Sequence, residues 1–131
     1  MVILNFMAPN DDIIESEGII QNVVRTAREC AFDQTRTDLR PCLTRPETKA
    51  FMARYNLHNR DIRNMLNILR IEDYCFTSRE TGKQDAYVFS PNTGEDYEVF
   101  LKIQITDGVL VLSFHEPVRP LDFPFRRRKT K

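Results

Sequence analysis

Several patterns that mark common functional classes are missing from this chain of 131 residues. Its four glycines form no phosphate-binding loop of the GxxxxGK(S/T) or GxGxxG type. Its three cysteines show no CxxC spacing and its two histidines lie far apart, so we expect neither a disulfide framework nor a metal site, and no cofactor. No apolar run approaches the roughly 18 residues of a membrane-spanning helix, and the start shows no signal-peptide pattern. These absences predict a cytoplasmic protein without membrane association.

An excess of charge of either sign is also missing, because 19 Lys and Arg balance 19 Asp and Glu. The charges are unevenly spread: residues 1–24 contain acidic residues and no Lys or Arg, whereas the last six residues, RRRKTK, hold five cations. A basic tail attracts phosphate groups, so nucleic acid is one candidate partner. A solvated, disordered terminus that aids solubility explains the same tail, and both interpretations stay open.

Three helices are predicted from apolar residues that recur at helical spacing. The first spans residues 18–32 behind Ser16 as N-cap, and residues 33–42 have the composition of a loop. The second follows a capping box of Thr44 and Glu47, and the third follows shortly after it. The residues expected to face the core are Ile20, Val23, Val24, Ala27, Ala31, Ala50, Phe51, Tyr55, Ile62, Met65, Leu66 and Leu69.

The second half of the chain has the alternating pattern of β-strands. Strands are predicted at residues 85–89, 98–106 and 109–116, with a turn at 90–94, and prolines from Pro117 onward argue against a further strand. Helices followed by an antiparallel meander indicate an α+β fold, in which amino-terminal helices pack on a small antiparallel sheet.

The last two predicted strands meet at Asp107-Gly108, a pair typical of a two-residue hairpin turn. Because side chains alternate along a strand, this turn fixes which residues share a face. The face expected to pack on the helices carries Ile105, Leu110, Ile103, Leu112, Leu101 and Phe114. The opposite face carries Thr106, Val109, Gln104, Val111, Lys102, Ser113, Phe100 and His115.

That second face combines groups that suit the cleavage of RNA. An imidazole such as His115 exchanges protons near neutral pH, and Lys102 stabilises an anion. Attack of a 2′-OH on the adjacent phosphate needs a base, an acid and positive charge, and no metal. Candidate substrate-binding residues are Arg79 and Lys83 in the preceding loop, Tyr87 or Phe100 as stacking rings, and Ser113 and Gln104. A solvated sheet face without a function is the alternative explanation.

The order of several short motifs resembles the MqsR family of toxin–antitoxin ribonucleases, which share a compact RelE/ParE-like fold. The likeness runs from about Thr44 to Glu116. It comprises Thr44-Arg45 before a helix, the helix 65–74 (MLNILRIEDY), 84–87 (QDAY), 100–103 (FLKI) and 110–114 (LVLSF). The corresponding family motifs are Thr-Arg, Leu-x-x-x-Asp-Phe, Trp-Gln-Asp-Val-Tyr, Tyr-Leu-Lys-Leu and Leu-Ile-Val-Ser-Phe.

The resemblance implies a metal-independent endoribonuclease that cleaves mRNA and is held inactive by a cognate antitoxin, and it leaves association with the ribosome open. It implies catalytic roles for Gln84, Lys102 and His115, the last standing where the family has Lys. Two family positions differ, because Phe76 replaces a Lys and Phe100 replaces a Tyr. The likeness divides the chain into an amino-terminal extension with one helix (1–43), the core (44–117) and a Pro-rich, basic tail (118–131), within a single globular domain.

Two other functional classes remain open at the level of sequence. A relative without catalytic activity would use the same fold as an RNA- or ribosome-binding module or as a protein-interaction adaptor. The replacements at Phe76 and Phe100 favour this alternative, whereas Gln84, Lys102 and His115 favour the enzyme. A small-molecule enzyme that uses Cys75 or His58 is a third hypothesis, although a buried Cys75 and a helix-capping His58 explain these residues without catalysis.

Overall fold

The computed structural model describes residues 10–80 and 82–126. The start from Met1 to Met7 and the basic tail after Arg126 therefore lie outside the described residues. The elements in chain order are β1 (Asn10–Ile13), α1 (Glu17–Cys30), β2 (Thr37–Asp38), α2 (Arg40–Leu43), α3 (Pro46–Arg54), α4 (Asn59–Asn67), the 3-10 helix η2 (Ile71–Asp73), β3 (Tyr74–Glu80), β4 (Ala86–Phe89), β5 (Phe100–Ile105) and β6 (Val109–His115).

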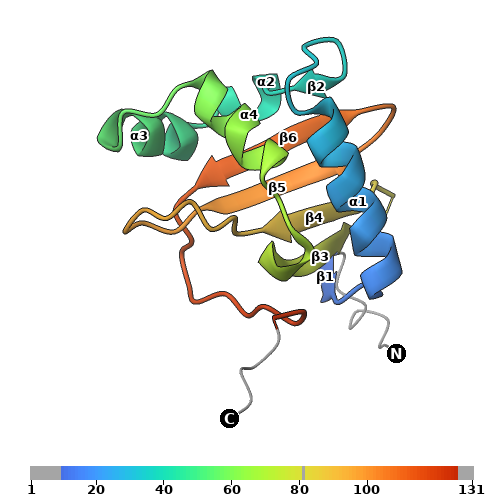
Figure 1. Cartoon of the computed structure of the whole chain (residues 1–131). Helices are drawn as coiled ribbons and strands as arrows, with labels where there is room; N and C mark the ends of the chain where they lie inside the picture. Colours follow the sequence, from blue (N-terminus) through green and yellow to red (C-terminus); the bar gives the residue numbers. More distant parts are fainter. Residues whose placement is uncertain (1–9, 81, 127–131) are drawn as a thin grey trace.

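The strands form one six-stranded sheet in the order β1-β3-β4-β5-β6-β2, and all pairs are antiparallel except β2 with β6. Helices α1, α3 and α4 lie on one side of this sheet (Figure 1). The predicted α+β class is therefore confirmed. Both outer strands, β1 and β2, come from the amino-terminal part of the chain and join the same sheet as β3–β6.

Helices α1 and α4 follow the predicted apolar pattern closely. The Ser16 hydroxyl accepts a hydrogen bond from the backbone N–H of Ile19 at 3.4 Å, as an N-cap does. All residues predicted to face inward from these two segments are buried: Ile20, Val23, Val24, Ala27, Ala31, Ile62, Met65, Leu66 and Leu69. Within the part of the chain that the structure describes, no helix is both long and apolar enough to cross a membrane.

The region between these helices differs from the prediction. The predicted capping box is wrong, because α3 begins at Pro46 and the Thr44 hydroxyl instead donates to the Pro41 carbonyl at 3.1 Å. Ala50 is exposed on this helix, while Thr48 and Phe51 are buried. The predicted loop at 33–42 contains β2 and the start of α2.

Strand β3 was not expected from the sequence. Its pairing with β4 shifts between Tyr74 and Phe76, and this bulge interrupts the alternation that would have revealed a strand. Arg79 therefore lies in a strand and not in the loop where it was predicted.

The β5–β6 hairpin has a longer turn than predicted. Ile105 pairs with Val109, and the intervening loop is closed by a hydrogen bond from the Thr106 N–H to the Gly108 carbonyl at 2.9 Å. A register shift beside Lys102 then restores the predicted pairs Lys102–Ser113 and Phe100–His115. The predicted faces are consequently wrong on the turn side of the shift: Val109 and Val111 are buried in the core, whereas Leu110 and Leu112 are half-buried.

Candidate functional site

The face of the sheet opposite the helices, here called the outer face, collects much of the predicted site. One row across it is formed by Phe76, Val88, Lys102 and Ser113, paired in that order from β3 to β6. Phe100 and His115 form the neighbouring pair. Diagonal neighbours on one face lie roughly 7–8 Å apart, so Lys102 and His115, which is two residues from the partner of Lys102, are near neighbours on the outer face.

His115 is held by a ring contact and a hydrogen bond. Its imidazole stacks on Phe100 with ring centroids 4.8 Å apart and an interplanar angle of 9°. Its Nδ1 lies 2.7 Å from the backbone carbonyl oxygen of Glu116. Because a carbonyl oxygen only accepts, Nδ1 carries the proton of this hydrogen bond, and Nε2 of the neutral ring is left as an acceptor. This is the tautomer that a general base at Nε2 requires.

Lys102 lines a cavity of about 340 Å³ on the outer face. The rings of Phe76 and Phe100 form part of its wall, and Val88 contributes a fully buried side chain. His115 lines a separate cavity of about 300 Å³ together with Arg54 of α3. Val118, a residue that is 90% exposed, lines both cavities.

Gln84 and Gln104 lie together at the end of the sheet near the β5–β6 turn. The Gln84 side-chain amide donates to the Ile105 carbonyl, and the Gln104 side-chain amide donates to the Gln84 carbonyl at 3.0 Å. These bonds extend the pairing of the strands beyond β4. Gln84 therefore has a structural role here, and Lys83 is exposed in the adjoining turn.

Arg79 and Tyr87 are not brought to the outer face. Arg79 makes ion pairs with Asp85 at 3.1 Å and with Glu15 at 3.4 Å. Tyr87 pairs with Ile103 and packs against the core, and burial raises the pKa of its hydroxyl. The predicted site residues thus lie in three places. Lys102, Ser113, Phe100 and His115 share the outer face, Gln84, Gln104 and Lys83 lie at the end of the sheet near the β5–β6 turn, and Arg79 and Tyr87 lie away from the outer face.

The segment from residue 117 to 126, here called the C-terminal segment, is the part of the site that the sequence did not reveal. It leaves β6 and runs past the ends of the middle strands toward β3 (Figure 1). Val118, Arg119 and Leu121 line the Lys102 cavity. Apolar residues alternate at Leu121, Phe123 and Phe125, but the surrounding prolines argued against a regular element, so the pattern was not recognised as a packing signal.

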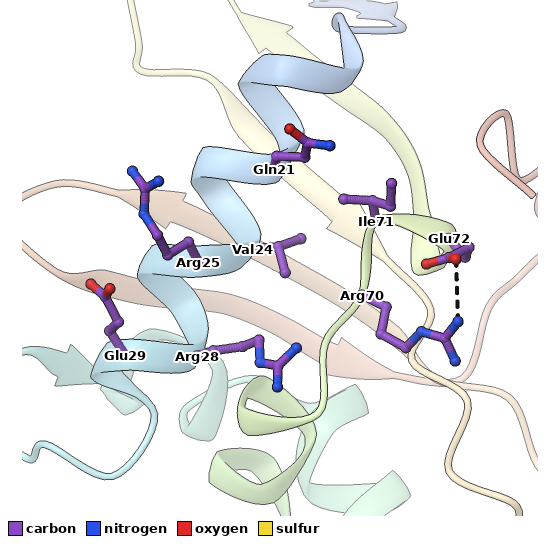
Figure 2. A pocket seen from close by; sticks show the side chains of 8 residues that line it. All are labelled: Gln21, Val24, Arg25, Arg28, Glu29, Arg70, Ile71 and Glu72. Carbon is purple, nitrogen blue, oxygen red and sulfur yellow. Dashed lines mark hydrogen bonds and ion pairs between the residues drawn. The ribbon is translucent and has the colours of Figure 1, made fainter.

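A larger groove of about 510 Å³ lies on the helix side, between α1 and the segment that leads into η2. Figure 2 shows Val24 of α1 opposite Ile71, with Arg28 and Arg70 at the rim and Arg70 paired with Glu72 at 3.2 Å. The sheet separates this groove from the outer face, so it is not part of the predicted site.

No other cluster in the described residues suggests a catalytic centre. Across residues 10–80 and 82–126, no group of three or more His, Cys, Asp or Glu side chains is arranged to hold a metal ion. His58 is the N-cap of α4, where its backbone N–H donates to Asp61 at 2.8 Å. Cys75 is 2% exposed, and burial raises the pKa of its thiol to about 12.

We expect Cys75 to be inert toward thiol reagents in the folded protein. At pH 8 its thiolate fraction should be about a thousandfold below that of an unfolded cysteine, because the pKa rises from 9.0 to about 12. Since the folded thiol keeps its proton and the unfolded thiol loses it, the free energy of unfolding should fall as pH rises between these values. Alkylation with and without urea, followed by peptide mass spectrometry to separate Cys75 from Cys30 and Cys42, measures the reactivity of this thiol. Rapid labelling of Cys75 in the native protein would contradict the expectation.

The comparisons with known proteins give no relative for this chain: no protein-family model matches it, and neither does any curated protein or solved structure.

Proposed function

We propose that this protein is a metal-independent endoribonuclease that cleaves mRNA, acting as the toxin of a type II toxin–antitoxin system with an MqsR-like, RelE/ParE-like fold. The observation that carries the proposal is the placement of His115 beside Lys102 on the outer face, with Nδ1 bonded to a backbone carbonyl and Nε2 left as an acceptor. The motif resemblance supports the same assignment.

The proposed reaction uses these two side chains on one phosphodiester. His115 Nε2 takes the proton of the ribose 2′-OH, whose oxygen attacks the adjacent phosphorus. Lys102 stabilises the negative charge that builds on the phosphoryl oxygens. The bond to the 5′-oxygen breaks, and that oxygen takes up a proton from solvent water. The products are a 2′,3′-cyclic phosphate and a 5′-hydroxyl, and a base next to the scissile bond would stack on Phe100.

Incubating the purified chain with mRNA tests the proposal. We expect cleavage between pH 6 and 8 that persists in a metal chelator and leaves 2′,3′-cyclic phosphate ends. Expression without an antitoxin should also arrest bacterial growth. The variant His58→Ala removes the other histidine, which lies at the exposed N-cap of α4. Purified in the same way, it serves as the matched control and should retain the cleavage activity. If the RNA stays intact at every pH and bacterial growth is unaffected, the proposed endoribonuclease activity is refuted.

A second candidate is a module that binds RNA or the ribosome, or serves as a protein adaptor, without catalysis. The observation in its favour is that the Gln84 amide bonds to the Ile105 carbonyl, so a residue implied in catalysis is used to join strands. Binding of RNA without any cleavage would establish this alternative.

A further inference from the structure

The cavity beside Lys102 is lined by charge from two separate parts of the chain. Lys102 belongs to β5, whereas Arg119 belongs to the C-terminal segment, and both side chains line the same space of about 340 Å³. The rings of Phe76 and Phe100 line it as well. One carboxylate, that of Asp12, also lines the cavity, so its lining carries two cations against one acid. This excess of positive charge attracts an anion, and the aromatic rings offer stacking surfaces.

The C-terminal segment that carries Arg119 is anchored at both of its ends. On one side the chain continues directly from β6. On the other, Phe125 stacks on Tyr74 with centroids 5.5 Å apart and an interplanar angle of 18°, and the Arg126 guanidinium lies 3.6 Å from the centroid of the Phe123 ring. Three prolines within the C-terminal segment further restrict the backbone. Arg119 therefore lies in a segment with anchored ends and a restricted backbone, and its side chain lines the Lys102 cavity.

Arg119 has one ion-pair partner among the described residues, and the contact is weak. Its guanidinium lies 3.9 Å from a carboxylate oxygen of Asp12 in β1, and the two side chains are 73% and 50% exposed. Ion pairs with this exposure contribute little to stability, since water screens them. A phosphate group in the cavity can replace Asp12 as the partner of Arg119 at small cost.

We propose that the C-terminal segment completes a nucleotide-binding subsite, in which Lys102 and Arg119 hold a backbone phosphate of single-stranded RNA and Phe76 with Phe100 contact a base. This inference rests on the proposed function, because it names how that substrate is held. It assigns to residues 117–126 a role at a defined cavity, whereas the sequence indicated only that a Pro-rich, basic tail could attract phosphate groups.

Binding of a labelled single-stranded oligonucleotide with 2′-O-methyl riboses, which cannot be cleaved by 2′-OH attack, tests this subsite. We expect Arg119→Ala to weaken binding about tenfold, since it removes one charge-assisted contact. The slope of log affinity against log salt should fall by about 0.7. Asp12→Asn should strengthen binding, because it removes a competing carboxylate. Arg119→Lys should retain most of the affinity, and Arg60→Ala, on the exposed start of α4, is the matched arginine control.

The outcomes separate the subsite from the catalytic proposal. If Arg119→Ala and Arg60→Ala bind alike while the wild type cleaves RNA, the subsite is refuted and the nuclease stands. If the wild type cleaves no RNA but Arg119→Ala selectively loses binding, the subsite stands and the nuclease is refuted. Absence of oligonucleotide binding by the wild type refutes the subsite directly. Thermal unfolding of each variant shows that any loss of binding is not a loss of fold.

Discussion

Replacing His115 by alanine is expected to lower the rate of RNA cleavage by about 10²-fold or more, the usual effect of removing a positioned acid–base group. The expectation follows from the hydrogen bond of Nδ1 to the Glu116 carbonyl, which leaves Nε2 to accept the 2′-OH proton. Lys102→Ala should cause a loss of similar size, because it removes the charge that stabilises the phosphoryl oxygens. Single-turnover cleavage of a short labelled RNA measures both effects without interference from product release.

The controls for these variants come from the same chain. His58→Ala and Lys49→Ala remove the same residue types from α4 and α3, away from the outer face, and should change the rate little. His115 also stacks on Phe100, so His115→Phe serves to keep the ring contact while removing the acid–base group. A loss below about threefold for His115→Ala would show that these residues only cover a sheet face.

Gly108→Ala is expected to destabilise the fold by about 3 kcal/mol, toward the upper end of what overpacking causes. A Cβ at this position would overlap the carbonyl oxygen of Arg36 and lie 2.8 Å from its carbonyl carbon. The same oxygen accepts a hydrogen bond from the Val109 N–H at 2.7 Å. Because the obstacle is backbone, no side-chain rotation relieves it, and β2 has to move away from β6. Urea unfolding followed by circular dichroism gives the change in stability.

Gly18→Ala is the matched control. Gly18 lies in the first turn of α1, and an added Cβ there meets nothing within 4 Å. This substitution should be neutral or stabilise the protein by about 0.4–1 kcal/mol, because alanine restricts the unfolded chain more than glycine does. Equal unfolding midpoints for Gly108→Ala and the wild type would contradict the close approach of β2 to the turn.

The helices were predictable where their signal is local. The apolar residues predicted to face inward from α1 and α4 recur every three or four positions, and a helix places residues with this spacing on one face. All of these predicted residues are buried. The capping box at Thr44 failed because Arg45 occupies the cap position ahead of Pro46, so the hydroxyl of Thr44 bonds backward to Pro41. The N-cap is the residue at which the backbone dihedral angles change from extended to helical, and sequence spacing does not determine that residue.

The sheet was harder to predict because its irregularities are set by distant residues. Strand β2 is two residues long and exists through its pairing with β6, which no local pattern reveals. The turn that contains Gly108, which lies against the backbone of Arg36, is one residue longer than predicted. The register shift beside Lys102 offsets this extra residue, so the strand pairing beyond it matches the prediction. The predicted pairing of Lys102 and His115 with their neighbours holds because both residues lie beyond that shift. Arg119 could not be assigned to the site, since its place depends on the path that the C-terminal segment takes past the strand ends.

The order of strands in the sheet has a consequence for folding kinetics. Strands β3 to β6 pair with near neighbours in the chain, whereas Asn10 pairs with Glu80 and Thr37 with Val109, across about 70 residues each. Closing such long loops is slow, so we expect the central meander to form before either edge strand docks. Until then both edges of the meander are open to pairing with other chains, and refolding at high protein concentration should favour aggregation. Substitutions in β1 or β2 should accordingly accelerate unfolding more than they slow folding.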